Sequence, residues 1–107
     1  MSDIVVFTSI NDEDVAEEII SDLLEAGLVR SGTILPGKTL YKWDGQMTID
    51  EEFKIMLKSG DEQYPEIEKY ILSKHPYLVP EVIKFSVSFG SEFFWQQVDE
   101  KKRRANA

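Results

Sequence analysis

Hydrophobic and polar residues alternate through much of residues 47–58, a pattern typical of a β-strand with two different faces. One face carries Met47, Ile49, Glu51, Phe53, Ile55 and Leu57, and the other carries Thr48, Asp50, Glu52, Lys54, Met56 and Lys58. Asp44-Gly45, just upstream, favours a two-residue turn because both central positions of a type I′ turn need positive φ. We therefore predict one long β-hairpin over residues 38–58. A ribbon of this length has exposed edges unless another chain pairs with it, so we expect an oligomer.

The N-terminal part of the chain predicts a strand, a helix and a second strand. Residues 4–7 are continuously apolar, which is typical of a central strand buried on both faces. Asn11 or Asp12 can cap the next helix, and Gly27 can end it. The apolar positions of that helix are Val15, Ala16, Ile19, Ile20, Leu23 and Leu24. Residues 28–35 form the second predicted strand, and the following Pro36-Gly37 predicts a bulge or kink before the hairpin resumes.

The C-terminal part predicts a helix, a strand and a last helix. Ser59 and Glu62 have the spacing of a capping box, which places a helix after them. Its inward stripe would be Tyr64, Ile67, Ile71 and Leu72. The helix must end near His75, because a residue before proline is pushed out of α geometry. A proline-stiffened segment leads into a strand over residues 82–87, and the last helix contains Phe93, Phe94, Trp95 and Val98.

The order of predicted elements is β-α-β-β-α-β followed by an extra C-terminal helix. It predicts an α+β fold with the ferredoxin-like arrangement, in which helices cover one face of an antiparallel sheet. We expect a single domain over residues 1–107. The other face of such a sheet must also be buried, and assembly into a trimer would bury it.

The amino-acid composition of the chain limits the classes of molecule that it can bind. The formal net charge is -8, with 20 acidic against 12 basic side chains, which disfavours binding to nucleic acid or to anionic membranes. The absence of cysteine excludes disulfides, thiolate metal sites and a cysteine nucleophile. No leader and no membrane-spanning run are evident in the sequence, so we expect a cytoplasmic protein.

Three stretches resemble the CutA divalent-cation-tolerance family, and the similarity runs over about residues 4–98. They are residues 35–45, which hold Leu-Pro-Gly and Tyr-Lys-Trp-Asp-Gly, residues 50–58, and residues 75–83, which read His-Pro-Tyr-Leu-Val-Pro-Glu-Val-Ile. The last stretch is the most specific. The resemblance implies a homotrimer joined through long β-hairpins, unusual thermal robustness, and a non-enzymatic role in tolerance of divalent metals, notably copper.

Two positions depart from the family pattern. Ser31 stands where family members commonly carry a cysteine, and Gln97 stands where they carry a tryptophan, with Trp95 two residues earlier. The copper chemistry suggested for the family uses sulfur. We therefore assign no certain cofactor: a divalent metal, copper or zinc, is the candidate, and the absence of cysteine weakens it.

Six residues are candidates for a site. His75, the only histidine, is the candidate metal ligand, with the alternative that it bonds nearby backbone at a helix end. The candidates for binding a small ligand in a cleft between subunits are Tyr41, Trp43, Lys58, Tyr77 and Glu81. Simple burial at the subunit interface is the alternative for Tyr41 and Trp43.

Two other functions fit the predicted fold. A trimeric small-molecule sensor resembling the PII signalling proteins is one alternative, although no glycine-rich loop precedes a helix here. An acylphosphatase-like enzyme is the other. It would need a phosphate-cradling loop after the first strand, where this chain instead has the acidic residues Asp12 and Glu13.

Overall fold

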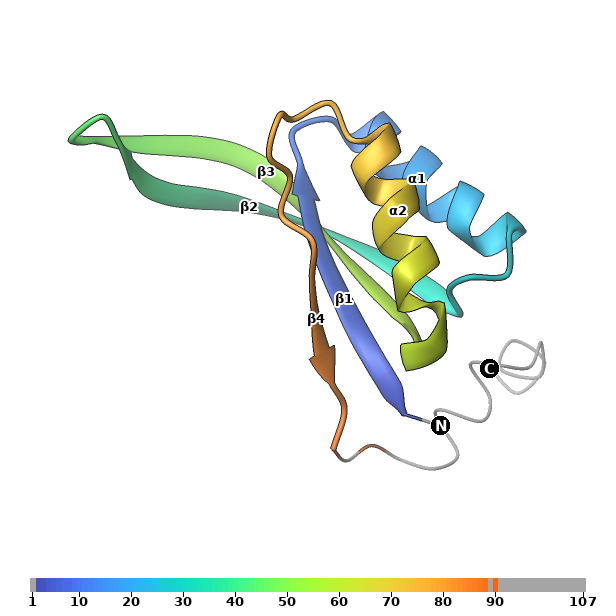
Figure 1. Ribbon diagram of the computed structural model, residues 1–107. Coiled ribbons are helices and arrows are strands. Elements are labelled where there is room, and N and C mark those ends of the chain that lie inside the picture. The colour runs from blue at the N-terminus through green and yellow to red at the C-terminus, as the bar shows by residue number, and fades with distance from the viewer. Residues whose placement is uncertain (1, 89, 91–107) are drawn as a thin grey trace.

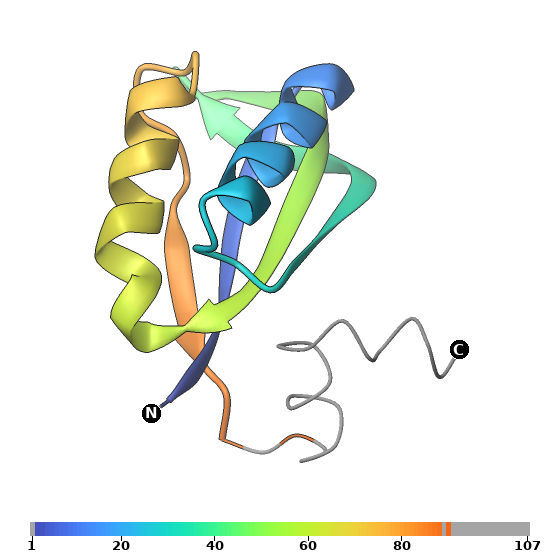
Figure 2. The ribbon, with the colours of Figure 1, turned by 90° about the vertical axis from the view of Figure 1, so that its right-hand side faces the viewer.

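The computed structural model describes residues 2–88 and Gly90. Its elements are β1 (Asp3–Ile10), α1 (Glu13–Glu25), β2 (Ser31–Trp43), β3 (Gln46–Gly60), the short 3₁₀ helix η1 (Asp61–Gln63), α2 (Tyr64–Lys74) and β4 (Ile83–Ser86). The four strands form one antiparallel sheet in the order β2-β3-β1-β4, and both α-helices lie on the same face of it (Figures 1 and 2). The predicted α+β fold with a ferredoxin-like order is confirmed. The predicted C-terminal helix lies outside the described residues.

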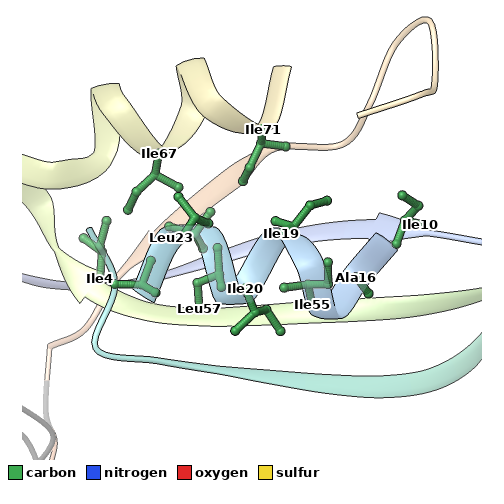
Figure 3. Close-up of a cluster of buried hydrophobic side chains, with 12 residues drawn as sticks. Ile4, Ile10, Ala16, Ile19, Ile20, Leu23, Ile55, Leu57, Ile67 and Ile71 are labelled. Carbon is green, nitrogen blue, oxygen red and sulfur yellow. The ribbon is translucent and has the colours of Figure 1, made fainter. Parts of the chain in front are cut away.

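Aliphatic side chains fill the space between the helices and the sheet (Figure 3). The fully buried ones include Ile4 and Val6 of β1, Ile55 and Leu57 of β3, Ile19 and Leu23 of α1, and Ile67 and Ile71 of α2. Each such burial stabilises the fold by roughly 1.5–3 kcal/mol. The other face of the sheet is less covered: Val5 and Phe7 are only partly buried, and Phe85 is exposed. In the described part of one chain, residues 4–7 are therefore not buried on both faces as predicted, because no second layer covers that side.

The hairpin of β2 and β3 projects well beyond the helices, and the molecule is 48 Å long against 26 Å in the other two directions (Figure 1). The turn has positive φ at both Asp44 (53°) and Gly45 (76°), as predicted. The predicted bulge or kink at Pro36-Gly37 is wrong as an interruption, because β2 runs through both residues and Pro36 pairs with Phe53 in an unbroken register. The proline is tolerated there because β2 is an edge strand of this sheet.

The helix ends show which local signals decide the structure. Asp12 caps α1 as predicted, since its carboxylate accepts bonds from the backbone N–H groups of Asp14 and Val15, and Gly27 follows the helix with a φ of 72°. The predicted cap at Ser59 is wrong. Its hydroxyl instead donates to the Leu28 carbonyl oxygen at 2.6 Å, because pairing with β1 extends β3 to Gly60.

The structure tests two predictions about α2, its C-terminal end and its buried face. The helix ends at Lys74, and the backbone of the next residue, His75, is extended, as the following proline requires. Ile67 and Ile71 face the sheet and are fully buried, and Tyr64 packs against them. The sequence pattern predicts Leu72 on the same stripe, but this side chain is exposed, so the buried stripe of the helix is narrower than the pattern indicates.

Candidate functional site

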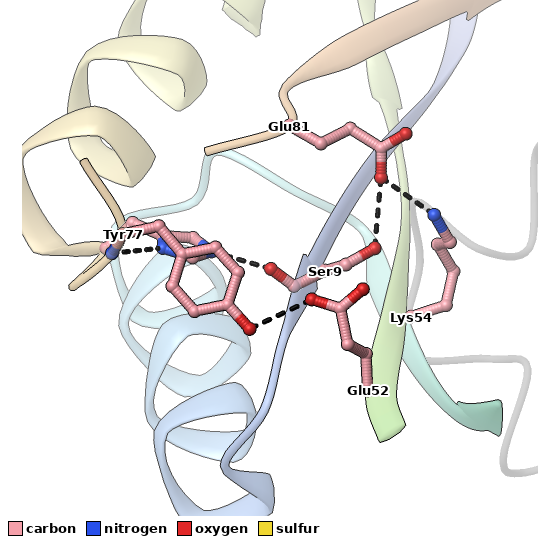
Figure 4. A network of polar contacts seen from close by, with 6 residues as sticks. Ser9, Glu52, Lys54, Tyr77 and Glu81 are labelled. Atoms are coloured by element: carbon pink, nitrogen blue, oxygen red, sulfur yellow. Dashed lines mark hydrogen bonds and ion pairs between the residues drawn. The ribbon is translucent and has the colours of Figure 1, made fainter. Parts of the chain in front are cut away.

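The segment that follows α2 crosses β1 and reaches β3 at the base of the hairpin. We call residues 75–81 the strap. It contains Pro76 and Pro80, which restrict its backbone. Side chains of the strap contact Ser9 of β1 and both Glu52 and Lys54 of β3 (Figure 4). The strap therefore contacts two paired strands, β1 and β3, at the base of the hairpin.

His75 fixes the start of the strap. Its Nδ1 accepts a bond from the backbone N–H of Tyr77 at 3.1 Å, which leaves the proton on Nε2. The protonated Nε2 donates to the carbonyl oxygen of Ser9 at 2.6 Å. The ring is buried and lies edge-on to the ring of Tyr77, with centroids 4.5 Å apart. Both ring nitrogens are thus engaged by the protein's own backbone.

Glu81 fixes the end of the strap. One of its carboxylate oxygens, Oε1, accepts from Nζ of Lys54 at 2.7 Å and from Oγ of Ser9 at 3.0 Å. The bond from Lys54 lowers the pKa of Glu81 below its usual value, and the bond from Ser9 adds to this, while partial burial opposes it. Glu81 is therefore a carboxylate held by two donors from two strands.

Two tyrosines hold two further carboxylates of β3. The Tyr77 hydroxyl donates to Glu52 at 2.9 Å, and the Tyr41 hydroxyl donates to Asp50 at 2.8 Å. Burial, and then the bond to Glu52, raises the pKa of Tyr77 to about 12. The bond to Asp50 raises the pKa of Tyr41 as well. Both hydroxyls therefore stay protonated at neutral pH and act as donors.

These residues surround a groove of about 330 Å³ at the base of the hairpin. It is lined by Ser9, Thr39, Tyr41, Asp50, Glu52, Lys54, Tyr77, Val79 and Glu81. Its size is at the lower end of the range typical for small-molecule sites. The combination of carboxylates, one ammonium group and two aromatic rings can bind a small polar molecule.

The structure brings together three of the predicted site residues and separates the others. Tyr41, Tyr77 and Glu81 line the groove. Trp43 lies at the hairpin turn and is 71% exposed. Lys58 lies near the other end of β3, paired with Val5 and Ser31. A ligand-binding role stays a prediction for all of them.

Six lining residues are not among the predicted ligand-binding residues: Ser9, Thr39, Asp50, Glu52, Lys54 and Val79. The alternation in β3 already placed Asp50, Glu52 and Lys54 on one face of the strand. That pattern was the available signal. Ser9 had none, because its role comes from the strap, which contacts it from 72 residues away at Glu81.

Existing hydrogen bonds occupy the ring nitrogens of His75 and the carboxylates of the groove, which are the atoms that a metal ion would need as ligands. Within residues 2–88 and 90, no three or more histidine, cysteine, aspartate and glutamate side chains cluster closely enough to hold one. A metal bound by His75 would have to break one of the two backbone bonds of its ring. The groove carboxylates already accept bonds from Tyr41, Tyr77 and Lys54. The described arrangement does not fit a metal centre, and the assignment of His75 as a ligand stays a prediction.

In the part of the chain that the structure describes, no helix is both long enough and apolar enough to cross a membrane.

The chain is similar to proteins of one family throughout most of its length. The family model for the CutA1 divalent ion tolerance protein matches residues 4–101. The divalent-cation tolerance protein CutA of Thermus thermophilus is 31% identical over 88 residues, which cover 81% of this chain and 85% of that protein. The crystal structure of CutA1 from the psychrotrophic bacterium Shewanella sp. SIB1 has a TM-score of 0.83 and 30% identity, and covers 90% of this chain and 91% of its own.

A third similar protein is described as periplasmic. It is the divalent cation tolerance protein CutA of Archaeoglobus fulgidus, with a TM-score of 0.82 over 92% of this chain and 99% of its own. At 24% identity, this similarity shows the fold alone. The predicted cytoplasmic location therefore stays a prediction.

Proposed function

Because this chain belongs to the CutA1 divalent ion tolerance family, we propose that it acts in tolerance of divalent metals, copper first among them, as a homotrimer joined through its hairpins. The family is named for tolerance of metal ions and not for a reaction. We propose that the protein acts by binding and does not catalyse a reaction.

The observation that carries the proposed assembly is the apolar surface of the hairpin. Leu40, Trp43, Met47 and Ile49 are all more than half exposed in the single chain, and they lie beyond the region that the helices cover. In the register of the hairpin, Leu40, Met47 and Ile49 share one face, and Trp43 lies on the other face near the turn. Exposed apolar side chains gathered at the end of a projecting hairpin mark an interaction site. Aromatic side chains are enriched in such interfaces, so we propose that Trp43 is buried between subunits.

The sheet supports the same assembly. Its two edge strands are β2 and β4, and an edge strand presents unpaired N–H and C=O groups that another chain can pair with. On β4, both Ile83 and Phe85 are exposed. Pairing with further copies would cover the edges, and packing of those copies against the sheet would cover its open face.

The groove at the hairpin base is the proposed ligand site. Tyr41, Tyr77 and Glu81 line it, and both strands of the hairpin contribute lining residues. Assembly through the hairpins would therefore place another subunit near the opening of the groove. Metal bound at His75 does not fit the described contacts. We therefore propose that the role in metal tolerance depends on what the assembled protein binds in this groove.

The test is copper tolerance of a host that lacks its own family member. Wild-type protein should restore growth in copper, whereas Trp43→Ala, which should weaken assembly, should restore it poorly. Lys69→Ala is the control, because Lys69 is exposed on α2, outside the hairpin. Equal growth with and without the wild-type protein would contradict the proposal, as would full rescue by a variant shown to be monomeric.

A further inference from the structure

Lys54 and Ser9 form a receptor for a carboxylate group. Nζ of Lys54 and Oγ of Ser9 converge on the same oxygen of Glu81, at 2.7 and 3.0 Å. The two residues face each other in the register of β1 and β3, and Ser9 is only 6% exposed. Because Ser9 and Lys54 belong to paired strands, their backbone positions do not depend on the carboxylate that they hold.

Glu81 is the replaceable part of this arrangement. It lies on the strap, outside any helix or strand, and its side chain is 40% exposed. The Lys54 side chain is 39% exposed. An ion pair with this much solvent contact is held weakly. An external carboxylate can therefore compete with Glu81 for the same two donors.

The neighbouring charges select which carboxylates can enter. Asp50 and Glu52 point to the same side of β3 as Lys54, and the hydrogen bonds described for their carboxylates come from the neutral hydroxyls of Tyr41 and Tyr77. The groove thus holds more negative than positive charge. A simple anion is repelled, whereas a ligand that also carries a cation is attracted.

The spacing along the strand fits a small zwitterion. The Cα atoms of alternate residues on one face of a strand are roughly 6.6–6.8 Å apart, and Glu52 and Lys54 are such a pair. The ammonium and carboxylate groups of one α-amino acid, each with a hydrogen bond outward, span a similar distance. The rings of Tyr41 and Tyr77 beside the carboxylates also favour an ammonium group.

We propose that the groove binds a zwitterionic α-amino acid, whose carboxylate replaces Glu81 on Lys54 and Ser9 while its ammonium group binds Asp50 and Glu52. This inference rests on the proposed function, because it names the ligand of the same groove. Glu81 then acts as an internal competitor of the ligand. Val79, which lines the groove from the strap, offers an apolar contact to the ligand side chain.

Calorimetric titration of the full-length protein tests the inference. The probes are the individual protein amino acids, with acetate and methylammonium as ligands that carry one half of the charge pattern. We expect at least one amino acid to bind, and each half-ligand to bind at least about tenfold more weakly. Glu81→Gln removes the competing charge and should tighten amino acid binding about tenfold. Lys54→Met should abolish binding, and Lys42→Met, a lysine of the same hairpin outside the groove, should leave it unchanged.

The direction of the Glu81 effect separates this inference from the simpler view of Glu81 as a binding residue. Weaker binding in Glu81→Gln would overturn the inference. So would the absence of binding in both the wild type and Glu81→Gln, or equal binding of acetate and the amino acid. Native mass spectrometry of the same samples separates the two proposals. A trimer without amino acid binding overturns this inference alone, and a monomer that binds an amino acid overturns the proposed assembly alone.

Discussion

The Nε2 atom of His75 lies 2.6 Å from the carbonyl oxygen of Ser9, a residue 66 positions earlier in the chain. The same ring accepts the backbone N–H of Tyr77 through Nδ1. One buried imidazole therefore joins the end of α2, the strap and the central strand β1. The imidazole holds the backbone of Tyr77 through Nδ1. It also bonds Ser9, which together with Lys54 donates to Glu81.

Replacing His75 should cost stability according to the bonds that each variant loses. His75→Phe keeps a ring of similar size but leaves the Ser9 carbonyl and the Tyr77 N–H without their partner. We expect the free energy of unfolding to fall by about 2–3 kcal/mol. His75→Gln can keep one of the two bonds and should lose about 1 kcal/mol less. Urea denaturation at equal protein concentration measures both, and equal stability of wild type and His75→Phe would contradict this account.

Metal binding at His75 is tested separately. Since both ring nitrogens are engaged, we expect Cu²⁺ titration of the wild type and of His75→Gln to give the same affinity within about twofold. The measurement is a competition titration against a coloured copper chelator. A tenfold or larger loss of affinity in His75→Gln would instead restore the histidine as a metal ligand.

Glu81 should make stability depend on pH in the acid range. The pKa of Glu81 is lowered in the folded state, first by the bond from Lys54, so the carboxylate stabilises the fold above its ordinary pKa of 4.5. This contribution disappears as the pH falls below that value and the carboxylate is protonated. Because the side chain is 40% exposed, we expect the stability difference between wild type and Glu81→Gln to stay below about 1 kcal/mol. Unfolding curves from pH 7 downward should converge, and a difference that grows as the pH falls would contradict the assignment.

The packing of α1 on β2 depends on the absence of a side chain at Gly32. A Cβ atom there would lie 2.7 Å from Cγ2 of Ile20 and 2.9 Å from its Cγ1. Both atoms belong to a branched, stiff part of that side chain, so the helix must shift. Gly32→Ala should lower the free energy of unfolding by about 1–3 kcal/mol. Gly37→Ala is the matched control on the same strand, because its added Cβ meets nothing within 4 Å, and equal effects of the two changes would refute the packing argument.

Much of the fold follows from local sequence patterns. Asp44-Gly45 predicts the hairpin turn, because few other residue pairs adopt positive φ at both positions. Asp12 predicts the start of α1, and the proline after His75 predicts the end of α2. The prediction at Ser59 failed because pairing with β1 outweighs the local preference for a helix cap. The predicted interruption at Pro36 was wrong for a similar reason, since the pairing of β2 with β3 continues through this residue.

The site is less accessible to sequence reasoning. Alternation along β3 shows that Asp50, Glu52 and Lys54 share a face, but not which segment crosses that face. The strap provides that contact through Tyr77 and Glu81, which are 25 and 27 residues away from their β3 partners. Periodicity contains no information on such long-range contacts. The family motif drew attention to the strap, but it did not indicate that the strap contacts Lys54.

We predict that the exposed hairpin assembles the protein into a trimer. Native mass spectrometry of the full-length protein at low micromolar concentration measures this assembly, with wild type, Trp43→Ala and Lys69→Ala compared side by side. We expect the mass of three chains for the wild type and for Lys69→Ala, and a shift toward single chains for Trp43→Ala, because truncating a buried interface tryptophan typically costs about 2 kcal/mol or more, on the order of thirtyfold in affinity. A wild-type protein that stays monomeric would contradict the account. A trimer of full strength in Trp43→Ala would contradict the role of the hairpin turn in the interface.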